Sequence, residues 1–130
     1  MDNVQEFVAD CLEHLQRGEA GKVLHPLMEV DPVALPVLMD AFARTKDDEI
    51  RALLLHCIWQ HRLPESIDFL ACVVRDDAGE AWKEALDGLV AIGGDTAERA
   101  LQSDLDTTQD SIKLEWIEEA LQQIRPGESP

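Results

Sequence analysis

Several residue types and patterns that would indicate a particular class of protein are scarce or missing here. The chain of 130 residues has no tyrosine, and its only cysteines are Cys11, Cys57 and Cys72. An odd number of widely spaced cysteines forms neither a disulfide framework nor a zinc-binding pattern, so a reducing compartment fits best. The N-terminus lacks a targeting segment, and no run approaches the roughly 18 apolar residues that span a bilayer. These absences predict a cytoplasmic protein.

Basic residues are also scarce in the sequence. The sequence has 27 acidic and 11 basic residues, a net charge of −16. This charge repels phosphate backbones and anionic lipids, so nucleic acid and membranes are not expected as partners. A basic protein would be attracted and its encounter accelerated, although an acidic surface can equally serve only to keep a protein dispersed. The charge is densest in residues 76–130, with 14 acidic and 4 basic side chains, so we expect a partner to bind there.

Apolar residues make up 45% of the chain and recur every three or four positions along nearly its whole length. This spacing predicts amphipathic helices, and because no segment alternates with period two for long, no strand is expected. The length fits one domain with a core of its own. We expect a single helical domain over residues 1–125, followed by a frayed tail at residues 126–130.

Turn residues mark where several of these helices begin and end. Asp31 followed by Pro32 is typical of a helix start, since the acid can cap free backbone N–H groups and proline suits the first turn. Gly18 and the pair Gly93 and Gly94 are typical of helix ends, where a residue with positive φ is often needed.

Other local predictions are tied to single residues. Pro26 should limit the start of a helix whose apolar residues continue to Met28. Asp95 with Glu98 three residues on resembles a capping box at a helix start. Residues 103–110 are polar and are expected to form a linker, whose aspartates lack the glycine and closing glutamate of a calcium-binding EF-hand loop.

The apolar pattern repeats at intervals of 31 to 32 residues. A repeat of this length is typical of stacked helix pairs, because one pair cannot bury its apolar face alone. Regular helix length could also produce such a coincidence by chance. The three matching stripes are Ile50, Leu53, Leu54, Cys57 and Ile58; Trp82, Ala85, Leu86, Leu89 and Val90; and Trp116, Ile117, Ala120 and Leu121.

Residues 85–101, with the sequence ALDGLVAIGGDTAERAL, resemble a HEAT-like repeat of the type first named for phycobilisome lyases. The pattern is a helix containing Ala-Leu, a Gly-Asp turn and a second short Ala-Leu helix. The resemblance is good over residues 80–102 and looser over 47–74 and 110–124, and the first 45 residues resemble the repeat only as helix pairs. It implies an all-α fold, a right-handed stack of antiparallel helix pairs (a HEAT-like α-solenoid) with about seven or eight helices.

In size, acidity and repeat form, the chain is similar to the small immunity proteins of bacterial polymorphic and contact-dependent toxin systems. This resemblance implies a monomer that binds a cognate toxin domain one to one and occludes its active site with an acidic surface. The toxin would be a basic protein, often a nuclease. Two alternatives stay open: an adaptor that assembles other proteins, and a lyase-type enzyme suggested by the name of the repeat. HEAT-like DNA glycosylases need a basic surface, which this sequence lacks.

The candidate partner-binding residues are acidic side chains in the second half of the chain and one tryptophan. Trp59 lies at the edge of its apolar stripe and is the best candidate for an exposed anchor, although a half-buried structural role is the more common outcome. Trp82 and Trp116 lie on stripes, so core packing is expected for both. An ordinary solvated surface is an equal alternative for the acids. The acidic candidates are Asp76, Asp77, Glu80, Glu84, Asp87, Asp104, Asp106, Asp110, Glu115, Glu118 and Glu119.

The sequence contains no pattern that indicates catalysis, a metal site or a cofactor site. His56, Cys57 and His61 are near one another, but Cys57 lies on the apolar stripe. The two histidines are five residues apart, whereas metal coordination on a helix favours a spacing of three or four. Cys11 and Cys72 have apolar neighbours and are expected to pack as small buried residues. We therefore expect a protein that is not an enzyme and that binds no metal or cofactor.

Overall fold

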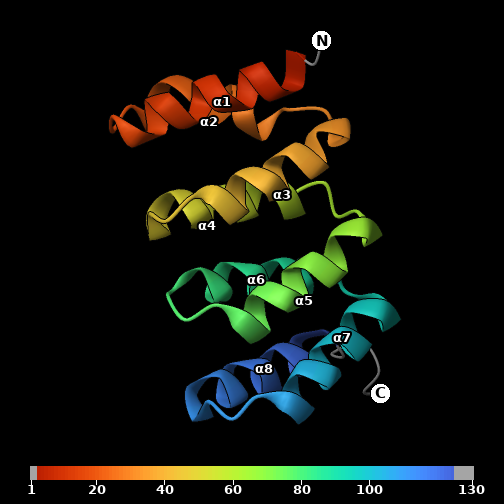
Figure 1. Ribbon diagram of the computed structural model, residues 1–130. Coiled ribbons are helices and arrows are strands. Elements are labelled where there is room, and N and C mark those ends of the chain that lie inside the picture. The colour runs from red at the N-terminus through yellow and green to blue at the C-terminus, as the bar shows by residue number, and fades with distance from the viewer. Residues whose placement is uncertain (1–2, 125–130) are drawn as a thin grey trace.

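Eight α-helices and two short 3₁₀ segments make up the described part of the chain, residues 3–124 of this computed structural model. Residues 3–124 contain no strand, which confirms the expected all-α fold and number of helices. Each odd-numbered helix is antiparallel to the even-numbered helix that follows it, and the four pairs stack in chain order (Figure 1). The helices are α1 (Asn3–Gln16), α2 (Ala20–Met28), α3 (Leu35–Arg44), α4 (Asp48–Trp59), α5 (Ile67–Asp76), α6 (Ala81–Ile92), α7 (Gly94–Thr107) and α8 (Ser111–Ile124), with 3₁₀ segments at Pro32–Ala34 and Pro64–Ser66.

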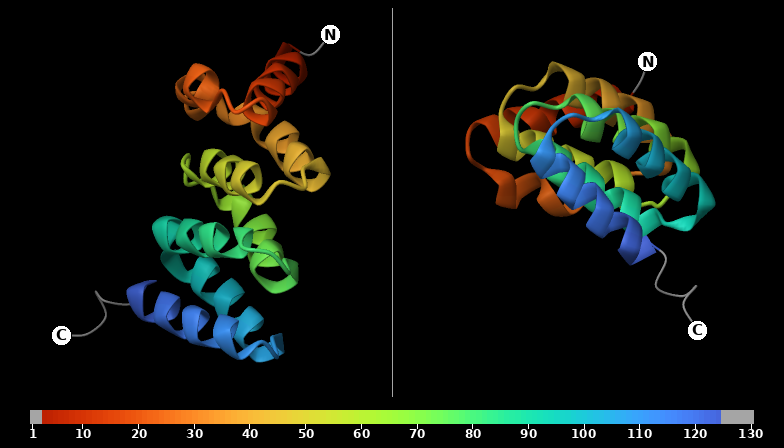
Figure 2. Two further views of the ribbon diagram at one scale, coloured as in Figure 1. Left: turned by 90° about the vertical axis from the view of Figure 1, so that its left-hand side faces the viewer. Right: turned by 90° about the horizontal axis from the view of Figure 1, so that it is seen from below.

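The pairs form two layers. The odd-numbered helices lie in one layer and the even-numbered helices in the other, and successive pairs are rotated relative to one another (Figure 2). The turns within pairs all lie at one end of the helices, on the left in Figure 1, and the connections between pairs lie at the other end. The α5–α6 and α7–α8 turns therefore lie close together, and the outer surface of the even layer runs continuously from α2 to α8.

The core lies between the layers and continues through the stack. Leu54 and Ile58 of α4, Leu70 of α5 and Leu89 of α6 are fully buried in it. Gly88 of α6 is also buried, and it lies directly against the ring of Trp59. Burying such side chains supplies the main stabilisation of the stack. None of the described helices is long and apolar enough to cross a membrane.

The turn residues behave mostly as expected. Asp31 Oδ1 accepts a hydrogen bond from the Val33 N–H at 2.9 Å and so caps the first 3₁₀ segment. Gly18, Gly93 and Gly94 have φ of 78°, 64° and 84°, which confirms that these positions need residues tolerant of positive φ.

The prediction for the start of the second helix was wrong. Pro26 lies inside α2, which begins six residues earlier at Ala20. The missing proline N–H removes one helical bond near the end of this short helix, and the helix continues because Val23 and Leu27 bury its apolar face.

The predicted linker at residues 103–110 is mostly helix. The helix α7 continues to Thr107 because its inward face persists through Leu101, Asp104 and the partly buried Leu105. It begins at Gly94 without a side-chain cap, so the predicted capping box at Asp95 does not form. The predicted tail at residues 126–130 lies outside the described residues.

Candidate protein-binding face

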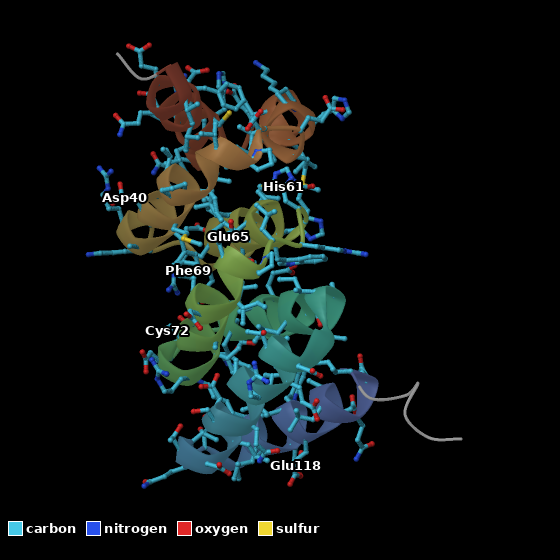
Figure 3. All side chains as sticks on the ribbon, turned by 90° about the vertical axis from the view of Figure 1, so that its right-hand side faces the viewer. Asp40, His61, Glu65, Phe69, Cys72 and Glu118 are labelled. Atoms are coloured by element: carbon cyan, nitrogen blue, oxygen red, sulfur yellow. The ribbon has the colours of Figure 1, made fainter. Side chains whose placement is uncertain are left out.

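The structure divides the predicted acidic residues between two locations. The first is the set of turns at one end of the last two pairs, and the second is the outer surface of the even-numbered helices. Glu118 belongs to neither, because it lies on the far flank of α8 at the free end of the stack (Figure 3). The turn set contains Asp76, Asp77, Asp104, Asp106 and Asp110, and the outer-surface set contains Glu80, Glu84, Asp87, Glu115 and Glu119.

Asp77 is a structural residue rather than a surface acid. Its side chain is only 4% exposed and accepts a hydrogen bond from Arg51 of α4 at 2.7 Å. It also accepts the backbone N–H of Trp82 at 3.2 Å, in the first turn of α6. Because the carboxylate is used to join α4 to the start of α6, it does not face a partner.

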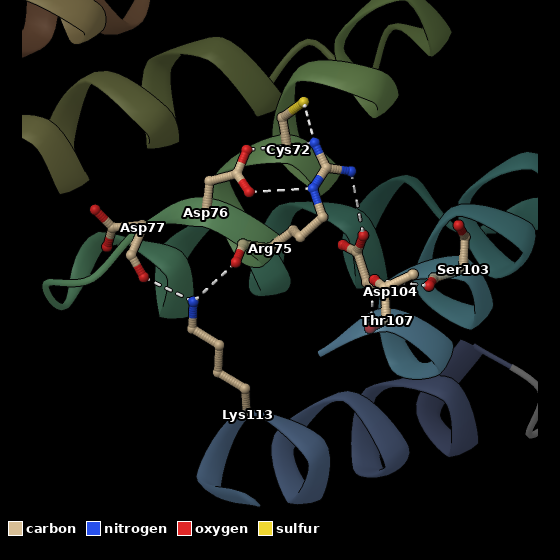
Figure 4. Close-up of polar contacts among 8 residues, drawn as sticks. All are labelled: Cys72, Arg75, Asp76, Asp77, Ser103, Asp104, Thr107 and Lys113. Atoms are coloured by element: carbon tan, nitrogen blue, oxygen red, sulfur yellow. Dashed lines mark hydrogen bonds and ion pairs between the residues drawn. The ribbon is translucent and has the colours of Figure 1, made fainter. Parts of the chain in front are cut away.

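Lys113 forms the second internal link in this region. Its ammonium group is buried and donates to the carbonyl oxygens of Asp77 at 2.7 Å and Arg75 at 3.4 Å (Figure 4). These carbonyls lie at the end of α5, where backbone acceptors lack helical partners and a positive charge is favourable. Lys113 therefore fixes α8 beneath α5, and its charge is not displayed on the surface.

Asp104 is also buried, with 1% of its surface exposed. Its Oδ1 lies 3.8 Å from Arg75, and its Oδ2 has no hydrogen-bond partner. Burial raises the pKa of this carboxyl to about 6, although Arg75 opposes the shift. Arg75 also bonds to Asp76, so the exposed Asp76 is already paired (Figure 4).

Two further residues in this region are placed differently from the sequence expectation. Cys72 is exposed and accepts a hydrogen bond from Arg75 at 3.0 Å, so the prediction that it is buried was wrong. The helical spacing places it on the outer flank of α5, while Ala71 and Val74 face inward. Asp110 caps α8 by accepting the N–H groups of Ile112 and Lys113, and Asp106 is exposed.

The last helix exposes two large apolar side chains. Trp116 is 43% exposed and Ile112 is 59% exposed, so the expectation that Trp116 packs in the core was wrong. The buried line of α8 runs through Lys113, Ile117 and Ala120 instead. Within residues 3–124, no helix covers the side of α8 that carries Ile112 and Trp116.

Trp116 lies in an acidic setting. Its ring meets the ring of Trp82 edge to face at 5.4 Å, and Lys83 Nζ lies 5.2 Å from its centroid. A hollow of about 270 Å³ beside it is lined by Glu115 and Glu119. Neither carboxylate forms an ion pair with any residue in 3–124. Tryptophan is enriched in binding hot spots, so an exposed tryptophan beside two carboxylates is a candidate contact for a cationic partner.

The carboxylates of α6 continue this surface toward α4. Glu84 Oε2 accepts hydrogen bonds from Trp59 Nε1 at 2.9 Å and His56 Nδ1 at 3.2 Å. Trp59 is partly buried, so its side chain holds Glu84 and is not an exposed anchor. Asp87 lies one turn after Glu84 on α6. Partial burial raises the pKa of the Asp87 carboxyl, and the negative charge of Glu84 raises it further by a smaller amount. Glu80 pairs with Lys83 at 2.6 Å.

We call the outer surface of α6 and α8 the even-helix face. It carries five carboxylates, one lysine and an exposed tryptophan. Trp116 and Ile112 were missed as surface residues in the sequence, because the inward side of α8 is set by the bonds of Lys113 to the end of α5 and not by residues near it in the chain. The face consists of Glu80, Lys83, Glu84, Asp87, Ile112, Glu115, Trp116 and Glu119.

This arrangement is suited to recognition of a cationic, partly apolar surface. Within residues 3–124, no three His, Cys, Asp or Glu side chains come together as a metal site. Comparison of the chain with known protein families, with characterised proteins and with solved structures finds no match. The function is therefore inferred from the even-helix face.

Proposed function

We propose that this chain is an immunity protein that binds a basic toxin domain, in the cytoplasm of the cell that makes both, and neutralises it. The observation that carries the proposal is the exposed Trp116 between Glu115 and Glu119, two carboxylates that form no ion pair with residues 3–124. The net charge of −16 favours rapid encounter with a cationic partner. The stacked helix pairs and the resemblance to HEAT-like immunity proteins support the same function.

The inhibition would work by occupancy. A nuclease active site is surrounded by lysine and arginine side chains that bind phosphates. Glu115 and Glu119 would pair with these cations, and Trp116 would pack against an apolar patch beside them. With the even-helix face seated there, nucleic acid could no longer reach the site.

The test is capture of the product of the neighbouring toxin gene by the purified chain, followed by a toxicity assay. We expect a one-to-one complex and loss of toxicity. Trp116→Ala should weaken binding at least about 30-fold, the effect of a hot-spot loss of about 2 kcal/mol. Glu119→Lys should weaken it at least about tenfold, because a like charge then faces the cationic partner.

A matched control separates location from total charge. Glu13→Lys on α1 changes the net charge by the same amount, and Glu13 is exposed in the opposite layer. It should weaken binding less than about threefold, since charges outside an interface act mainly through long-range attraction. Equal loss with Glu13→Lys and Glu119→Lys would reject the even-helix face as the interface. A chain that binds the neighbouring protein without reducing its toxicity would instead be an adaptor.

A further inference from the structure

An apolar groove of about 440 Å³ crosses the even-numbered helices next to the even-helix face. Carbon-rich side chains from two helix pairs form most of its lining, namely Leu24 and Met28 of α2 with Ala52 and Leu53 of α4. Leu24 is 39% exposed, so the groove opens to solvent. The polar residues of the lining are Glu49, His56 and Glu84, and no lysine or arginine takes part.

Glu84 is held in a fixed position where the groove meets α6. Both of its hydrogen bonds, from Trp59 and His56, reach the same oxygen, Oε2. Its other oxygen, Oε1, accepts no hydrogen bond from the residues in 3–124. Because folding has already ordered this side chain, a cation that binds Oε1 loses little free energy to side-chain ordering.

We propose that this groove binds an amphipathic basic segment of the partner protein, an inference that rests on the proposed function. An apolar side chain of the segment would pack on Leu24 and Leu53. A neighbouring lysine or arginine would donate to Glu84 Oε1. Charge complementarity selects this occupant, because the lining contains the acidic residues Glu49 and Glu84 and no lysine or arginine.

The groove would extend the binding surface from α6 and α8 to α2 and α4. Glu84 belongs to both the groove and the even-helix face, so one partner can contact α2, α4, α6 and α8 together. Contacts on four helices would give the partner a larger interface than contacts at Trp116 alone. The groove has a volume of about 440 Å³, and the hollow beside Trp116 has a volume of about 270 Å³. A segment seated in the groove would add apolar burial to the ion pairs of α8.

The experiment uses the full chain and a labelled synthetic peptide with leucine and lysine at helical spacing. Binding is followed by fluorescence anisotropy, and the site is mapped by shifts of backbone amide resonances. We expect shifts at Leu24, Ala52 and Leu53. Glu84→Gln should weaken binding about tenfold, the usual effect of losing a hydrogen bond to a charged group. Glu118→Gln removes the same charge on the far flank of α8 and should change affinity less than twofold.

Two further measurements keep the test decisive. Leu24→Gln changes a side chain that is 39% exposed and should weaken peptide binding about fivefold, since the apolar contact with the peptide is lost. A peptide with glutamine in place of leucine should bind at least tenfold more weakly. Equal weakening by Glu84→Gln and Glu118→Gln, or amide shifts confined to α8, would overturn the inference because the attraction would then be diffuse.

Failure of this inference can be distinguished from failure of the proposed function. A toxin domain that binds the native chain but is insensitive to both Glu84→Gln and Leu24→Gln rejects the groove and leaves the function standing. Peptide binding mapped to the groove, without binding of the neighbouring toxin, upholds the groove and rejects the toxin as its partner.

Discussion

Gly88 allows α6 to lie against Trp59 of α4, and replacement of Gly88 by alanine tests this contact. An added Cβ would lie 2.6 Å from Cγ and Cδ1 of Trp59 and 2.8 Å from its Cβ. These distances are far below the roughly 3.5–4.0 Å at which carbon atoms attract one another. The indole would have to move by about 1 Å, and its N–H would then leave Glu84.

The expected loss of stability follows from three contributions. Overpacking of this kind costs about 1–3 kcal/mol. The lost hydrogen bond to Glu84 adds about 1 kcal/mol, because Glu84 is partly exposed and can be rehydrated. Alanine in place of glycine stabilises a helix by about 1 kcal/mol. The net expectation is that Gly88→Ala lowers the free energy of unfolding by about 2 kcal/mol.

Urea denaturation followed by far-ultraviolet circular dichroism measures this difference directly. Gly21→Ala in α2 is the matched control, because an added Cβ there meets nothing within 4 Å. It should raise the free energy of unfolding by about 1 kcal/mol, since only helix propensity changes. If Gly88→Ala stabilised the chain as much as Gly21→Ala does, Trp59 would not be confined by α6, and the account of how Glu84 is positioned would be refuted.

The remaining predictions concern the turns and the last helix. Burial raises the pKa of Asp104 from 3.8 to about 6, so the folded chain holds this proton more tightly, and the contribution of Asp104 to stability falls as pH rises through that range. Asp104→Asn should therefore raise the free energy of unfolding by about 1–3 kcal/mol at pH 7 and change it little at pH 4; urea denaturation at both values checks this, and equal gains would contradict it. Lys113→Met keeps the side-chain length but leaves two buried carbonyls without their donor, and should lower the free energy of unfolding by about 2–3 kcal/mol; an unchanged urea midpoint would contradict this. Trp116→Ala, at a side chain 43% exposed, should lower the thermal midpoint by only a few degrees (about 1 kcal/mol); a much larger fall would mean that Trp116 is a core residue.

The helices and most turns could be predicted because their signals are local. An apolar residue every third or fourth position shows which segments are helical, and Asp31 or Gly93 act on backbone groups within a few residues. The wrong predictions arose where tertiary packing outweighs local preference. Pro26 is tolerated in α2 because Val23 and Leu27 are buried, and residues 103–107 stay helical because Asp104 and the partly buried Leu105 face the core.

The binding face was harder to predict because it depends on how a helix is rotated about its axis. Ile112 and Lys113 are adjacent in the chain. A rotation of α8 by one residue therefore decides whether the apolar Ile112 or the charged Lys113 faces the core. Hydrophobicity alone would place Ile112 inward. In the structure Lys113 is inward instead, since the carbonyl oxygens at the end of α5 accept its protons. Such a long-range partner leaves no signal within α8 itself.

The inward position of Lys113 also accounts for the charge of the outer surface. Lys113 is the only basic residue of α8, so Glu115, Glu118 and Glu119 have no compensating charge on their own helix. Like charges three or four residues apart each cost a few tenths of a kcal/mol, which the helix tolerates because Lys113 and Ile117 anchor it internally. A cationic partner would remove this repulsion on binding. The same lysine therefore stabilises the last pair and leaves on its surface the unpaired acids that a basic protein can neutralise.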